Sequence, residues 1–155
     1  MQLQRRVVVT GLGILSPIGN SKDTDWSNCI NGVNGITEVD FGIADCPITV
    51  GGKLKDLDLE NLIPSKLSRR IDPFVQYGII SANEAIKDSH LNESDINPEK
   101  IGVSMGSGIG GLQSIELNHN NLNDRGFKKV SPFFVPGSIV TVSYTHLRAH
   151  ETSQN

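Results

Sequence analysis

The sequence has few cysteines, no long apolar run and no excess of positive charge, and each of these absences argues against a class of protein. Its 155 residues include two cysteines, with no second pair and no metal-ligand spacing, which argues against a disulfide framework. No apolar run approaches the ~20 residues that a membrane-spanning helix needs, and the start of the chain does not read as a signal peptide. The net charge of −3 argues against a general nucleic-acid binder. We therefore expect a soluble, cytoplasmic protein whose thiols, Cys29 and Cys46, are buried or half-buried.

What is present indicates an α/β domain. The length and an apolar content of 37% are sufficient for one domain with a real core. Residues 6–10 form a β-branched run without polar alternation, which is typical of a strand covered on both faces. A second apolar run, 101–105, leads into glycines at 106, 108, 110 and 111 and then into a helical pattern. Those glycines allow positive φ and close approach of a ligand or another segment.

The remaining elements follow from capping and spacing signals. Capping side chains at residues 20–23 predict a helix that ends at Asn31 and Gly32. Apolar spacing predicts helices from about Pro73 to His90 and from Leu112 to about residue 126. Residues 33–64 indicate loops with short edge strands, and residues 128–136 indicate a basic, aromatic loop shaped by two prolines.

The sequence of one glycine motif is compatible with binding of a nicotinamide cofactor. Gly106-x-Gly108-x-x-Gly111 matches the dinucleotide fingerprint and lies between an expected strand and an expected helix. A dinucleotide-binding unit also needs a second parallel strand after that helix, ending in an acidic residue. The chain instead continues into Asp124–Lys129 and a proline loop. An NAD(P)-binding oxidoreductase is therefore an alternative, and glycine used for close packing is the other interpretation.

Other candidate sites are weaker, and the sequence predicts no metal site and no cofactor. Glu116 and His119 have the spacing seen in carboxylate-bridged metal bundles, but a single pair favours a solvated surface. Cys29 falls within an amphipathic helix, where packing is favoured over nucleophilic work. Two basic clusters, Lys66–Arg70 and Lys128–Lys129, are either solvated charge or a docking surface for an acidic partner.

Four segments in unbroken order carry a resemblance to a known family. Residues 5–19, 70–77, 106–111 and 131–136 are similar to β-ketoacyl-[acyl-carrier-protein] synthase II, over about residue 4 to Val140. The resemblance implies a thiolase-like fold of two α/β halves and a homodimer. It also implies a decarboxylative Claisen condensation of malonyl carrier protein with an acyl chain held on a cysteine. Only part of the first α/β half would be present here.

The catalytic residues of that family have no counterparts in this sequence. The family's nucleophile lies in a Thr-Ala-Cys-type segment beyond the Phe-Phe-Val-Pro loop, and its two histidines lie further on. Cys29, Cys46, His90 and His119 do not stand in those contexts. We therefore expect an amino-terminal fragment of a condensing enzyme that is itself inactive. A non-catalytic module that docks an acidic carrier protein is the rival interpretation.

Site residues follow from the resemblance position by position. Ile109 and Phe134 match residues that line the acyl pocket of the family. Lys66, Arg69 and Arg70 match the helix that receives the acidic acyl carrier protein. Lys128 and Lys129 are weaker candidates for the same docking surface. No catalytic residue and no nucleic-acid partner is implied.

The last residues are expected to be non-native. Residues 142–152 are similar, residue for residue, to the translation of a transposase-type sequencing-library adapter. The pair His146-x-x-x-His150 has helical metal-ligand spacing but no third ligand, and it lies within this stretch. We therefore predict residues 1–140 as the natural, incomplete synthase domain and residues 141–155 as an adapter-derived tail.

Overall fold

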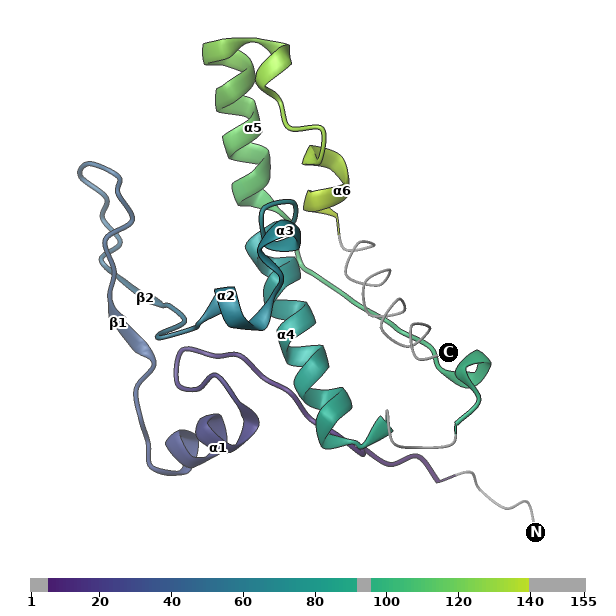
Figure 1. Cartoon of the computed structure of the whole chain (residues 1–155). Coiled ribbons are helices and arrows are strands. Elements are labelled where there is room, and N and C mark those ends of the chain that lie inside the picture. The colour runs from purple at the N-terminus through teal and green to yellow at the C-terminus, as the bar shows by residue number, and fades with distance from the viewer. Residues whose placement is uncertain (1–5, 92–95, 140–155) are drawn as a thin grey trace. The chain divides into compact units, whose positions relative to one another are not determined.

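The computed structural model describes residues 6–91 and 96–139 (Figure 1). The chain divides into two compact units, Met1–Lys55 with Ser81–Ser94 and Asp56–Ile80 with Asp95–Asn155. The long helix α4, Pro73–Asp88, contributes residues to both. Within the described residues, no helix is both long and apolar enough to cross a membrane. The predicted tail, 141–155, lies outside the described residues.

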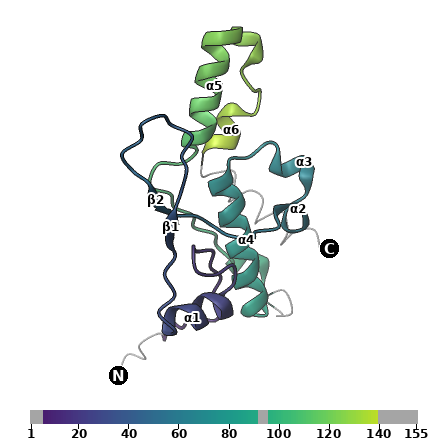
Figure 2. The same cartoon turned by 90° about the vertical axis from the view of Figure 1, so that its left-hand side faces the viewer.

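The first unit contains a capped helix and a β-hairpin. Helix α1 spans Lys22–Ile30, and the hydroxyl of Ser21 accepts a hydrogen bond from the Thr24 amide at 3.3 Å. Strands β1, Ile36–Glu38, and β2, Val50–Gly52, pair antiparallel (Figure 2). The Ser21 side chain thus satisfies one of the free amides of the first turn, and the predicted first helix is confirmed.

Two acidic side chains of α4 bind the segment that precedes α1, at Leu12 and Ile14. The amide of Leu12 donates to Asp88 Oδ2 at 3.0 Å, and the amide of Ile14 donates to Glu84 Oε2 at 2.9 Å. The other oxygen of Glu84 accepts from the Lys22 amide at 2.8 Å, at the first turn of α1. These carboxylates give hydrogen-bond partners to backbone amides that have none within a strand or a helix.

Lys22 and Asp88 form an ion pair, which predicts a pH-dependent contribution to stability. The hydrogen bond from Lys22, and then that from the Leu12 amide, lower the pKa of Asp88 below its usual 3.8. The hydrogen bond to Asp88 raises the pKa of Lys22 above its usual 10.5. The contribution should therefore be complete between about pH 4 and 10 and fall away in acid as Asp88 is protonated.

Asp88→Asn tests this coupling. Because both side chains remain partly exposed to water, the loss of stability at neutral pH should be small. Urea unfolding between pH 2 and 7 should show a shallower acid decline in the variant than in the parent chain. Identical pH profiles would contradict the assignment.

The second unit holds the buried apolar cluster. Ile71, Val75 and Ile79 form this cluster, with Leu67 and Phe74 packed against it. Helices α5 and α6 lie side by side in both Figure 1 and Figure 2. The elements of this unit other than α4 are α2 (Leu59–Leu62), α3 (Ser65–Ser68), η2 (Pro98–Lys100), α5 (Leu112–Arg125), η3 (Phe127–Lys129) and α6 (Phe134–Ser138).

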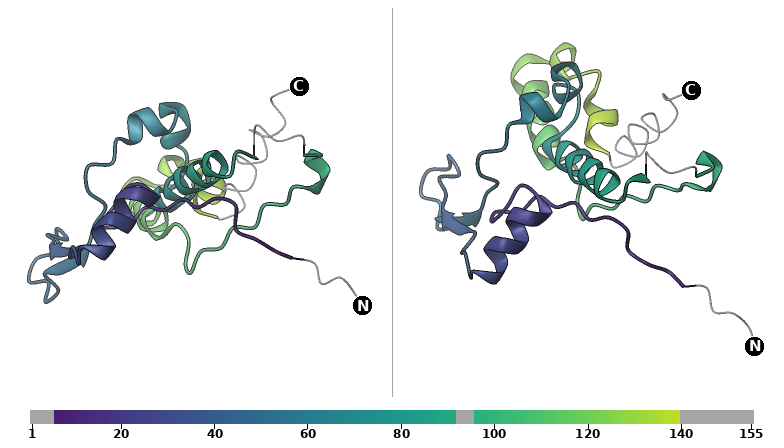
Figure 3. Two further views of the ribbon diagram at one scale, coloured as in Figure 1. Left: turned by 90° about the horizontal axis from the view of Figure 1, so that it is seen from below. Right: turned by 60° about the horizontal axis from the view of Figure 1, so that its bottom comes forward.

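The three longer helices were predicted correctly, but the two covered strands were not. Residues 7–9 are 93, 67 and 79% exposed, and residues 101–107 have no strand structure. Both stretches run as extended segments in Figure 3. A strand forms only against a partner, and the sheet in the described residues consists of β1 and β2 alone.

The proline-punctuated loop was predicted too long. Its second half forms helix α6, which begins at Phe134 and carries Pro136 as its third residue. Proline is compatible with the first turn of a helix because the amides there have no partner within the helix. Two prolines therefore shape this segment as expected, but one of them does so inside a helix.

Cys29 also departs from its prediction. Both cysteines are free thiols, and Cys46 is half-buried as expected, but Cys29 is exposed. Helix α1 contains no buried residue, and Trp26 on it is 66% exposed. Among the described residues, no element buries the apolar side chains of this helix. The amphipathic spacing that predicts packing of Cys29 is therefore present without the packing.

Candidate functional site

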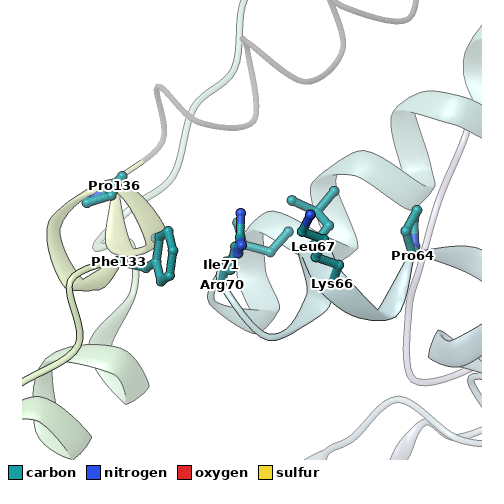
Figure 4. A pocket seen from close by; sticks show the side chains of 8 residues that line it. Pro64, Lys66, Leu67, Arg70, Ile71, Phe133 and Pro136 are labelled. Atoms are coloured by element: carbon teal, nitrogen blue, oxygen red, sulfur yellow. The ribbon is translucent and has the colours of Figure 1, made fainter. Parts of the chain in front are cut away.

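A pocket of about 410 Å³ lies in the second unit (Figure 4). One wall comes from the stretch between α2 and α4, and the other comes from α6 and the residue before it. Figure 4 shows the ring of Phe133 turned toward Arg70 across this space. The lining residues are Pro64, Lys66, Leu67, Arg70, Ile71, Phe133, Pro136 and Gly137.

The pocket combines an apolar lining with two cationic side chains. Leu67 and Ile71 belong to the buried cluster or pack against it, so the wall continues into the core. The guanidinium carbon of Arg70 lies 4.5 Å from the centroid of the Phe133 ring, which is within range of a cation–π contact. Lys66 is exposed at the same pocket. Such a surface suits an apolar group presented by an anionic partner.

Asp72 lies next to this pocket and connects its two walls. Its amide donates to Gly137 O at 3.0 Å, and its Oδ2 accepts from the Ser114 amide at 3.0 Å. The residue is 4% exposed. A buried carboxylate requires such donors because desolvation otherwise opposes its charge.

The glycine segment contributes close packing in the structure. Gly110 takes a φ of +89°, and a Cβ on Gly111 would lie 2.8 Å from Ser138 Cα. The Gly111 amide also donates to Ser138 O at 3.1 Å. Beyond α5 the described chain continues as η3 and α6, with no strand. The last two glycines thus have a packing role, whereas a Cβ on Gly106 would meet nothing within 4 Å.

The structure brings some predicted docking residues together and leaves others apart. Lys66 and Arg70 both line the pocket, while Arg69, the C-cap of α3, is exposed and does not line it. Lys128 and Lys129 are exposed in η3 and also lie outside the lining. The basic cluster is therefore only partly associated with the pocket.

The two predicted acyl-pocket residues lie on neighbouring elements. Ile109 is 75% exposed in the glycine segment, and Phe134 is half-buried as the first residue of α6. The Gly111–Ser138 hydrogen bond joins these two elements. The resemblance assigns no role to Phe133, but Phe133 and Pro136 are the residues of the Phe-Phe-Val-Pro motif that line the pocket.

Glu116 and His119 are both exposed on α5, as a solvated pair would be. The His119 ring lies 3.2 Å from the Asn123 side-chain amide. Within residues 6–91 and 96–139, no three His, Cys, Asp or Glu side chains are grouped so that they could hold a metal ion.

Two solved structures with this fold are ketosynthases. One match is AntDE:AntF, a type II PKS acyl-carrier protein in complex with its ketosynthase bound to the hexaketide. The TM-score is 0.74 and the sequence identity is 27%, and the match covers 93% of this chain and 38% of that chain. A β-ketoacyl synthase from Burkholderia phymatum STM815 matches with a TM-score of 0.77 and 17% identity, covering 96% and 37%. The fold is therefore that of the thiolase-like ketosynthases, as predicted.

Sequence comparison identifies the family within that class. Residues 4–144 match the family described as "Beta-ketoacyl synthase, N-terminal domain", and the chain belongs to this family. The 3-oxoacyl-[acyl-carrier-protein] synthase 2 of Staphylococcus aureus (strain N315) is 45% identical over 137 residues, covering 88% of this chain. That of Vibrio cholerae serotype O1 is 43% identical over 140 residues, covering 90%. The chain spans about a third of the length of these relatives.

Proposed function

We propose that this chain is the amino-terminal part of a β-ketoacyl-[acyl-carrier-protein] synthase. The whole protein would extend fatty acyl chains by decarboxylative condensation with malonyl carrier protein. The observation that carries the proposal for this part is the apolar pocket with Lys66 and Arg70 on its lining. Within the whole enzyme, this part supplies a docking surface for the carrier protein and walls for the acyl chain.

Charge complementarity supports the docking role. Lys66, Arg69 and Arg70 lie within five consecutive residues at α3 and its C-terminus, on a chain whose net charge is −3. A local cationic surface on an acidic protein attracts an acidic carrier to one place and raises the association rate at low salt. Lys128 and Lys129 form a second, weaker attachment in this proposal.

We also propose that Ile109 and Phe134 contribute to the acyl pocket of the whole enzyme. The support is the contact between their elements, because Gly111 packs directly against Ser138 at the end of α6. Neither side chain is fully buried, so both are available to an acyl chain or to further parts of the protein. The homodimeric state and the cytoplasmic location are proposed from the family resemblance.

The 155-residue chain itself is proposed to be inactive in condensation. Cys29 lies in the last turn of α1 and not at a helix N-terminus, where a thiolate is stabilised. Cys46 is half-buried in the loop between β1 and β2. Neither cysteine stands in the Thr-Ala-Cys context that the family uses, so the covalent step has no nucleophile in this chain.

Charge reversal tests the docking proposal. Arg69→Glu with Arg70→Glu should weaken binding of an acyl carrier protein to the chain by about tenfold or more, because attraction becomes repulsion. Binding measured by fluorescence anisotropy at 20 and 300 mM salt should also lose most of its salt dependence. Lys128→Glu with Lys129→Glu should cause a smaller loss.

Lys53→Glu with Lys55→Glu is the matched control. It makes the same change in net charge at two exposed lysines of the first unit. Equal weakening by the control and by the Arg69 and Arg70 pair would mean that only overall charge matters. That result would refute a localised docking surface.

A further inference from the structure

Three segments far apart in the sequence form a closed junction in the second unit. Residues 70–72, 110–114 and 137–138 are joined pairwise by backbone or side-chain hydrogen bonds. Asp72 N donates to Gly137 O, Ser114 N donates to Asp72 Oδ2, and Gly111 N donates to Ser138 O. Asp72 makes two of these three connections.

We propose that Asp72 is a positioning residue that holds Arg70 against Phe133 by capping two helices with one carboxylate. The part of this proposal that concerns carrier binding rests on the proposed function. The part that concerns the geometry of Arg70 does not, and it can be tested separately.

The double cap is visible in the hydrogen bonds of Asp72. The residue stands immediately before Pro73, the first residue of α4, and its Oδ1 accepts from the Phe74 amide at 3.2 Å. Its Oδ2 accepts from the Ser114 amide in the first turn of α5. The N-cap residue of α5 is Gly111, which has no side chain that could accept this bond. Both helix N-termini therefore place donors and positive dipole ends on one carboxylate. A side chain with a single acceptor oxygen cannot place a separate oxygen on each of the two donors.

The backbone of Asp72 also connects to the segment that carries Phe133. The Asp72 amide binds Gly137 O, and the Gly137 amide in turn donates to Phe133 O at 2.7 Å. A Cβ on Gly137 would lie 2.4 Å from Arg70 O, so the two backbones are in direct contact. The guanidinium of Arg70 and the ring of Phe133, 4.5 Å apart, belong to the two segments that this connection joins.

Asp72→Asn separates the two caps. Asparagine is as good an N-cap as aspartate, but it has one acceptor oxygen, and its NH₂ group would face an N–H donor. Exchange of the Ser114 amide with deuterium should quicken by about tenfold, while the amides in the middle of α4 stay protected. The ring of Phe133 should displace the Nε–H resonance of Arg70 in the parent chain, and in the variant this resonance should move toward the value of a free arginine. Carrier affinity should fall by about threefold to tenfold.

Asp58→Asn is the matched control. Asp58 is the N-cap of α2 in the same unit, and its Oδ1 accepts from the Asn61 amide at 3.3 Å. It caps one helix, so asparagine should replace it without changing the Ser114 exchange rate or the Arg70 resonance. Ser114→Pro offers a second route if Asp72→Asn fails to fold. It removes the donor of α5 at a first-turn position that tolerates proline, and it should move the Arg70 resonance in the same direction.

The possible results distinguish the positioning of Arg70 by Asp72 from the docking of a carrier protein. An unchanged Arg70 resonance and unchanged Ser114 exchange in Asp72→Asn would overturn the positioning role. A loss of carrier affinity with an unchanged Arg70 resonance would also overturn it, because the affinity would then depend on something other than the position of Arg70. If the parent chain binds no carrier protein while both spectroscopic changes occur, the positioning of Arg70 is supported and the docking function fails.

Discussion

Gly137→Ala is expected to lower the stability of the second unit by about 3 kcal/mol. The new Cβ would lie 2.4 Å from the carbonyl oxygen of Arg70, and a backbone atom cannot turn aside as a side chain can. Alanine is the better helix former by about 1 kcal/mol, so the intrinsic preference within α6 acts in the opposite direction. A measured loss must therefore come from the contact.

Urea unfolding followed by exchange of the α5 and α6 amides would measure this effect. Gly106→Ala is the control, because a Cβ there meets nothing within 4 Å. The junction predicts a large loss for Gly137→Ala and a change below about 1 kcal/mol for Gly106→Ala. Equal stabilities of the two variants would show that Gly137 and Arg70 are not in contact in solution.

Gly13→Ala should have a comparable effect in the first unit. Its Cβ would lie 1.9 Å from Ser81 O and 2.8 Å from Ala85 N, both backbone atoms of α4. The loop would have to withdraw, and the Leu12 and Ile14 amides would lose their carboxylate acceptors on α4. We expect a loss of about 3 kcal/mol or more.

Exchange rates of the Leu12 and Ile14 amides report directly on this withdrawal. Both should rise by about a hundredfold in Gly13→Ala, which corresponds to about 2.7 kcal/mol. Gly51→Ala is the control within the same unit, since its nearest neighbour would be Phe41 at an ordinary contact distance of 3.4 Å. Protected Leu12 and Ile14 amides in Gly13→Ala would contradict the close packing of this loop on α4.

Local signals explain why the helices could be predicted. Ser21 caps α1, Pro73 begins α4 and Gly126 ends α5, and each of these residues acts within one turn of its own position. The strands depend on partners distant in sequence, and propensity at residues 7–9 cannot supply a partner. An apolar run therefore predicts the capacity for a strand, while pairing decides whether one forms.

In the pocket, too, residues with a local sequence signal could be predicted, whereas contacts between residues far apart in the sequence could not. Basic residues at Lys66 and Arg70 could be chosen from their charge and from the family resemblance. The role of Phe133 could not, because its ring meets Arg70 across 63 positions of sequence. For Asp72, the sequence Asp-Pro signals a cap on α4, but its bond to Ser114 is 42 residues away and has no sequence signal.

We propose that this chain binds a carrier protein but has no nucleophile for the condensing reaction. The most direct test is incubation of the 155-residue chain with an acyl carrier protein that bears a radiolabelled acyl thioester, followed by peptide mapping. We expect salt-dependent binding of the carrier, with labelling of Cys29 and Cys46 no faster than that of a free thiol. Acyl transfer to either cysteine at a rate above that of a free thiol would contradict it.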